Sequence, residues 1–181
     1  MLFRSGTLQI SKLETADLRA ITTTALRGWS TDQIKALATD EVQALTTAQV
    51  AALNTAQVSN LDSVDLAAMT TAQWAALTTA QAASLTVGQI SNIATDDLRA
   101  ITSANVRALN TQQIDALTSD QMAVLTNGQV AALTTQQVAA LTNTDLNAMT
   151  TSQFGVLSAA QVGALDTAQI NNLSVEIGRA S

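Results

Sequence analysis

The chain has 181 residues, of which 47% are hydrophobic, 12% are charged and 2% are aromatic. It contains no Cys, His, Pro or Tyr, which excludes disulfides, zinc fingers and catalysis by Cys or His. The net charge of −6 argues against a nucleic-acid partner, and the apolar runs are too short to insert into a membrane.

An eight-residue unit, called the octad below, repeats without insertion or deletion from Gly6 to Leu173. Read from Thr46, successive octads are TTAQVAAL, NTAQVSNL, DSVDLAAM and TTAQWAAL. Positions five and eight are apolar throughout, as at Val50 and Leu53. Because the repeat leaves no room for a linker, residues 6–173 are predicted to form a single solenoid domain.

The spacing of the apolar positions predicts one short helix in each octad. A continuous helix fails because eight residues advance its apolar face by about 80° per octad. A strand fails because the apolar spacing alternates between five and three instead of two. The prediction is therefore an all-α solenoid of very short helices, six or seven residues each, with a β-solenoid of octapeptide coils as the alternative.

Each octad contains residues that favour capping of a helix N-terminus. Position one is usually Thr, Ser, Asn or Asp, the preferred N-cap residues; Gly6, Glu14, Ala38 and Ala94 are exceptions. Position four is usually Gln or an acid, which completes a capping box. The Leu before each cap and the residue at position five then form a hydrophobic staple, for example Leu45 with Val50.

A second repeat of 80 residues lies over the first. Residues 14–22 recur at 94–102 and residues 65–71 at 145–151, so the chain divides into blocks 6–85 and 86–165 plus the start of a third. Duplication of a ten-octad block is the favoured interpretation. The alternative is that ten octads complete one superhelical turn.

The two ends fit neither period. LFRS near the start and IGRA near the end resemble the translation of a common sequencing adapter in its two orientations. Residues 1–5 and 176–181 are therefore predicted to be non-native, and the chain to be a metagenomic fragment of a longer array. Without natural capping repeats, its ends are expected to fray or to self-associate end to end.

Acidic and basic side chains give the first two candidate sites. Calcium could bind at Asp17, Asp65, Asp96, Asp97 and Asp145, but an acid replacing Gln near a helix N-terminus is the preferred explanation, so no metal is predicted. The basic residues at position six are predicted to form a row on one face, which could bind an anion or an acidic partner but is better explained as a solvated face; they are Arg19, Arg27, Lys35, Arg99 and Arg107.

The remaining candidates are weaker. Trp29, Trp74 and Phe154 are expected in the core, and Phe3 in the adapter segment. Rows of Thr at positions one and two suggest ice binding, a minor alternative because the second row is imperfect. The hydroxyls lack a His or a suitable Lys base, and no nucleotide or nucleophile-elbow motif occurs. Neither an enzyme nor a cofactor is predicted.

The string LTTQQVAALTNTDLNAM, residues 133–149, resembles octapeptide arrays of large secreted or surface-exposed bacterial proteins of the adhesin or RTX kind. The resemblance covers Gly6 to Leu173 and implies an extracellular stalk joined to other domains of a parent protein. A solenoid scaffold that binds protein, peptide or glycan is the alternative function.

Overall fold

The chain folds into a solenoid of short α-helices and, over the residues described, contains no strand. The computed structural model describes residue 10 and residues 13–173. The predicted all-α solenoid is confirmed and the β-solenoid alternative is wrong. The helices are α2 (Thr15–Ala20), α3 (Thr23–Arg27), α4 (Thr31–Lys35), α5 (Thr39–Ala44), α6 (Thr47–Ala52), α7 (Thr55–Ser59), α8 (Ser63–Ala68), α9 (Thr71–Ala75), α10 (Thr79–Ser84), α11 (Val87–Ser91), α12 (Thr95–Ala100), α13 (Ser103–Ala108), α14 (Thr111–Asp115), α15 (Ser119–Val124), α16 (Asn127–Ala131), α17 (Thr135–Ala139), α18 (Asn143–Ala148), α19 (Thr151–Gly155), α20 (Ala159–Val162) and α21 (Thr167–Asn171).

Each helix is four to six residues long, slightly shorter than the predicted six or seven. The octad must also supply the joint between helices. At Leu45 (φ −56°, ψ 136°) and Thr46 (φ −71°, ψ 156°), two consecutive extended residues end α5 and start α6. The chain therefore changes direction at the joint almost without a loop.

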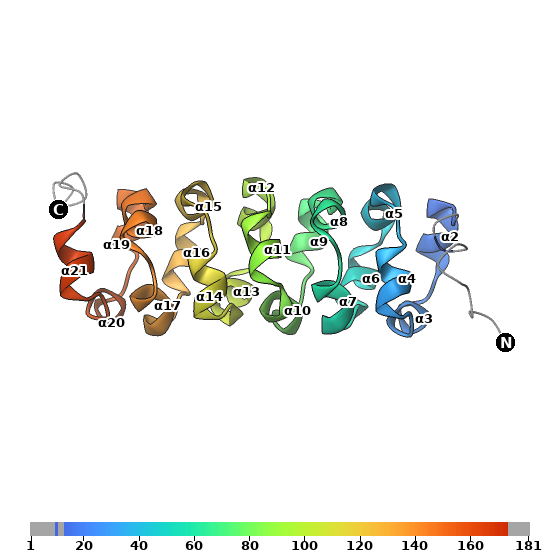
Figure 1. Cartoon of the computed structure of the whole chain (residues 1–181), viewed down its shortest axis with the longest axis horizontal. Helices are drawn as coiled ribbons and strands as arrows, with labels where there is room; N and C mark the ends of the chain where they lie inside the picture. Colours follow the sequence, from blue (N-terminus) through green and yellow to red (C-terminus); the bar gives the residue numbers. More distant parts are fainter. Residues whose placement is uncertain (1–9, 11–12, 174–181) are drawn as a thin grey trace.

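The helices stack by packing each one against the third helix that follows it. The pairs α2–α5, α5–α8, α10–α13 and α12–α15 are in contact. Figure 1 shows the result, a rod with α2 and α21 at its opposite ends. Because helices this short are unstable alone, this stacking between turns holds the structure together.

The pitch of the superhelix corrects one sequence interpretation. Along one long edge of the rod lie α2, α5, α8, α12, α15 and α18 (Figure 1), three or four octads apart in the sequence. Between α2 and α12 the chain returns to this edge after three, three and four octads. The interpretation of ten octads as one superhelical turn is therefore wrong: ten octads make three turns.

Positions five and eight of the octad form the core, which runs along the rod. Leu98 and Ile114, at position five, are fully buried, and Trp29 and Trp74 belong to the same core. Phe154 is partly buried against it, and Phe3 lies outside the described residues. The indole Nε1 of Trp74 is the one buried side-chain donor without an acceptor in the described part of the chain.

The predicted non-native ends, residues 1–5 and 176–181, lie outside the described residues. Among those that are described, no helix combines the length and apolar character needed to cross a membrane.

Candidate functional site

The Gln at position four joins two turns of the superhelix, in an arrangement called the Gln bridge below. The Gln81 Oε1 atom accepts from the backbone N–H of Thr78 at 2.8 Å, which is its half of the capping box. Its Nε2 atom donates to the carbonyls of Val50 at 2.7 Å and Leu53 at 2.8 Å, 31 and 28 residues earlier. One buried amide thus caps its own helix and ties it to the preceding turn.

The bridge recurs along the rod because each helix ends in carbonyl groups that require a hydrogen-bond donor. The last carbonyls of a helix have no partner within the helix, and a buried carbonyl without a partner is costly. The Gln Nε2 atom satisfies them one turn later. The Gln side chains that donate to the carbonyl 28 residues earlier are Gln49, Gln57, Gln73, Gln81, Gln89, Gln113, Gln121, Gln129, Gln137, Gln153, Gln161 and Gln169.

Sequence reasoning assigned these Gln residues to capping alone and missed the bridge. The sequence feature that could have indicated the bridge is the preference for Gln over Glu at position four. A capping box needs only an acceptor at position four, so the second half of the amide, a double donor, required an acceptor elsewhere.

Three octads lack a side-chain cap at position one, those of α2, α5 and α12, which begin with Glu14, Ala38 and Ala94. At Ala38 only the Glu41 carboxylate contributes, accepting from the Ala38 backbone N–H. In the others, the position-one side chain accepts from a backbone N–H, as Thr118 does from Gln121.

Acidic residues replace Gln at several bridge positions. Glu41, Asp65, Asp97 and Asp145 are buried there, whereas Asp17 is exposed. Burial raises the pKa of Asp65 to about 6, with a smaller contribution from the Asp62 charge. Burial raises the pKa of Glu41 and Asp97 as well, with smaller contributions from the charges of Asp40 and Asp96.

The helices that carry these acids lie along one side of the molecule, called the acidic edge below. Its helices α2, α5, α8, α12, α15 and α18, with their caps, carry ten carboxyl groups and two Arg side chains, a net charge of −8. The other described octads carry three acidic and three basic residues, which cancel. The members of the acidic edge are Glu14, Asp17, Asp40, Glu41, Asp62, Asp65, Asp96, Asp97, Asp120 and Asp145.

The candidate calcium ligands do not converge on one point. Within residues 13–173, no three acidic side chains lie close enough together to hold a metal ion. Asp65, Asp97 and Asp145 sit on separate helices, α8, α12 and α18.

The position-six Arg residues do not form one row. Arg19 and Arg27 belong to α2 and α3, which lie on opposite edges of the rod in Figure 1, because successive octads turn around the superhelix. Three of these Arg side chains instead donate to a backbone carbonyl 25 residues later, on the next turn of the superhelix. The Arg19 Nε donates to the Ala44 carbonyl at 3.0 Å, and the Arg99 Nε to the Val124 carbonyl at 3.1 Å. Arg107 donates likewise to Ala132 at 3.4 Å.

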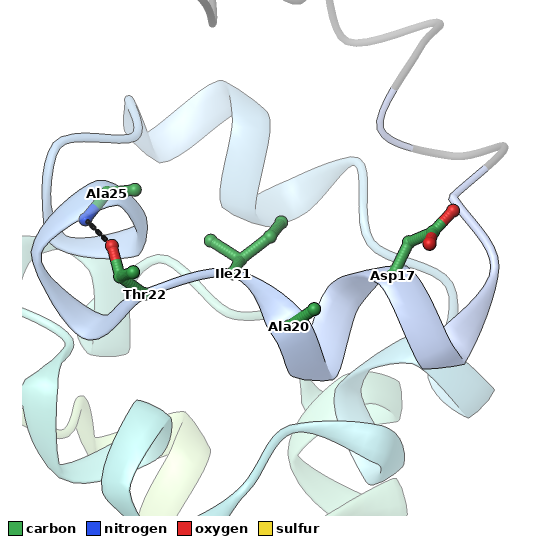
Figure 2. Close-up of a pocket in the computed structure, with 5 residues that line it drawn as sticks. All are labelled: Asp17, Ala20, Ile21, Thr22 and Ala25. Atoms are coloured by element: carbon green, nitrogen blue, oxygen red, sulfur yellow. Dashed lines mark hydrogen bonds between the residues drawn. The ribbon is translucent and has the colours of Figure 1, made fainter.

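The surface of the described residues includes two open depressions. One, of about 290 Å³, lies between α2 and α3 (Figure 2), where Asp17 and Ala25 occupy bridge positions and are shorter than Gln. Its Thr22 hydroxyl already accepts from the Ala25 N–H. The other, of about 310 Å³, lies between α13–α14 and α17 and is lined by Arg107 and uncharged residues.

The Thr rows differ in their chemistry. The hydroxyls at position one are capping acceptors, as at Thr46 and Thr134, whereas position-two residues such as Thr47 and Thr135 are exposed. Since successive octads face different sides, position-two hydroxyls do not form one continuous row.

The comparison with known protein families matches the same repeat. The family model of the ALTTAQ repeat matches residues 10–47, 35–63, 58–94, 90–127 and 143–175, which together cover most of the chain. The chain belongs to the ALTTAQ repeat family. No curated protein matches it.

The family string has a structural meaning here. ALTTAQ occurs at residues 44–49 and 76–81. It covers the end of one helix (Ala44, Leu45), the N-cap (Thr46) and the first turn of the next helix, up to the bridging Gln49. The ALTTAQ string therefore spans the joint between two helices. It contains the Leu45 carbonyl, which accepts a Gln bridge from Gln73, and Gln49, which makes a bridge of its own.

Proposed function

We propose that this segment is a non-enzymatic spacer or stalk within a larger secreted or surface-exposed bacterial protein. The observation that supports it is the Gln bridge, repeated from turn to turn along a rod whose first and last helices lie at opposite ends. Such a segment would hold whatever precedes it far from whatever follows it. Its length would increase in proportion to the number of octads.

The outward-facing residues support the same role. Positions two and three are exposed and mostly small or polar, as at Thr79, Ala80, Thr135 and Gln136. Binding surfaces are usually enriched in aromatic and Arg side chains. Here the large side chains and the bridging amides are used inside the rod.

Length in solution tests this function. A second copy of residues 54–133 inserted after Leu133 adds ten octads and keeps both the octad and the superhelical phase. We expect the maximum dimension from small-angle X-ray scattering to grow by about half, with an unchanged cross-section. A maximum dimension that stays the same, or a cross-section that widens, would contradict the spacer.

A binding scaffold is the second candidate, and the depression lined by Arg107 is the observation that favours it. Arg107 there has polar neighbours, among them Asn110 and Gln136, which suit a peptide or glycan. A stoichiometric hit in a peptide and glycan screen that is lost in Arg107→Ala would establish this function instead.

Association between copies is part of the proposal. Val162 and Ile170 hold the core position five but are 45% and 51% exposed. Exposed apolar side chains of this kind favour contact with a second copy. Sedimentation velocity over a range of concentrations tests this, and a monomer at every concentration would exclude it.

A further inference from the structure

Two octads of the acidic edge place a carboxyl group where the Gln bridge has its amide. By the register of the bridges, the carbonyl 28 residues before Asp65 is that of Leu37, and the carbonyl 28 residues before Asp97 is that of Met69. Both residues are more than nine-tenths buried, and in the described structure neither side chain makes a hydrogen bond. An ionised carboxylate only accepts hydrogen bonds, so it cannot satisfy those carbonyls.

Asn105, one octad after Asp97, shows what a side chain of this length can reach. Its Nδ2 atom donates to the carbonyl of Leu77, 28 residues earlier, at 2.7 Å. Asparagine and aspartic acid have the same length and shape, so an Asp that carries a donor can make the same bond. Protonation supplies that donor, because a neutral carboxyl group has one O–H.

We propose that Asp65 and Asp97 are proton-dependent bridges between turns, which form when each carboxyl takes a proton from solvent and donates it to the carbonyl of Leu37 or Met69. The Gln bridges hold the rod at any pH, and these two act only in mildly acidic solution. The turns along the acidic edge are then held together more strongly as the pH falls, because these two hydrogen bonds form.

Charged groups of both signs surround the two residues. The neighbouring charges that raise the pKa are Asp62 for Asp65 and Asp96 for Asp97, whereas Lys35 and Arg99 act against them. The charged groups near Asp65 come from its own cap, from α5, from α4 and from α12, while α11 has none: Asp62, Asp40, Glu41, Asp32, Lys35, Asp96, Asp97 and Arg99. Near Asp97 they come from α12 itself, from α15 and from α8, while α9 has none: Asp96, Arg99, Asp120, Asp62 and Asp65.

The sign of the pH dependence follows from these surroundings. Burial raises the pKa of Asp65 to about 6, and also raises that of Asp97. A raised pKa means that the folded chain binds the proton more tightly than the unfolded chain does. Stability therefore increases as the pH falls through about 6, and the gain is complete below about 4, the ordinary value for Asp.

Thermal unfolding of the full chain tests the proposal with the double variant Asp65→Asn/Asp97→Asn. We expect the unfolding midpoint of the unmodified chain to rise between about pH 7.5 and about pH 5. The double variant should unfold at a higher temperature at neutral pH, with most of that rise removed, because Asn donates at any pH. Asp120→Asn, exposed on the same edge, is the matched control and should keep the full rise.

A double variant that keeps the full rise overturns the proposal, as does one that is less stable than the unmodified chain at neutral pH. A second measurement does not depend on mutation. Carbon-13 NMR titration should place the Asp65 carboxyl midpoint well above about 4, the ordinary value for Asp, and a midpoint at the ordinary value would also overturn the proposal. Calcium chloride that stabilises the chain at neutral pH as much as acid does would show instead that the site takes a cation.

Discussion

Gln137 donates from its Nε2 atom to the carbonyl of Leu109, 28 residues earlier, at 2.7 Å. The same amide nitrogen lies 3.1 Å from the carbonyl of Val106, while its Oε1 atom accepts from the Thr134 N–H at 2.7 Å. One side chain therefore connects the start of α17 to the end of α13, four octads earlier. This hydrogen-bond pattern stabilises the superhelix, because it joins a helix start to carbonyls 28 and 31 residues earlier.

Replacing the amide with a carboxylate should break the bridge while keeping its shape. Gln137→Glu leaves the Leu109 and Val106 carbonyls without their donor and buries a charge, so we expect a loss of about 3 kcal/mol in the free energy of unfolding. Gln136→Glu, the exposed neighbour on α17, should change it by less than about 0.5 kcal/mol. Urea unfolding followed by circular dichroism measures both, and equal losses would refute the bridge.

The N-caps allow a paired test in opposite directions. Thr118→Ala removes the acceptor for the Gln121 N–H and should cost about 1 kcal/mol. Ala94→Thr adds a cap where α12 has none and should stabilise the chain by a similar amount. If both variants shift the unfolding midpoint in the same direction, capping does not control these helix starts.

Burial at position five can be tested with one residue type. Val130 is fully buried and Val162 is 45% exposed, although both hold position five. Val130→Ala should cost about 2 kcal/mol through lost burial, and Val162→Ala less than about 0.5 kcal/mol. Similar costs at the two sites would argue against a continuous core that is covered by the later turn.

Local features of this fold could be predicted from the sequence, and features that depend on the next turn could not. The octad identifies the helix, its cap at Thr46 and its core residues Val50 and Leu53, because all of these interactions lie within a few residues. The joint angle that sets the pitch is not encoded in any single position. The alternative interpretation of ten octads as one superhelical turn was therefore wrong.

The acidic edge shows the same limit for the candidate site. Asp65 and Asp97 are 32 residues apart, and their common side follows only from the return of α8 and α12 to one edge. The 80-residue repeat takes on a physical meaning once the pitch is known. A block that makes three turns can be added without changing the side on which any later octad lies.

Hydrogen exchange of the Gln side-chain amides tests the Gln bridge most directly, because it needs no mutation. If Nε2 of Gln137 is buried and bonded to two carbonyls, its protons should exchange at least about 100-fold more slowly than those of exposed Gln136, which follows from an opening free energy of about 3 kcal/mol. Slow exchange at Gln113, Gln121 and Gln129 as well would establish the bridge along the rod. Equal exchange rates for Gln137 and Gln136 would contradict it.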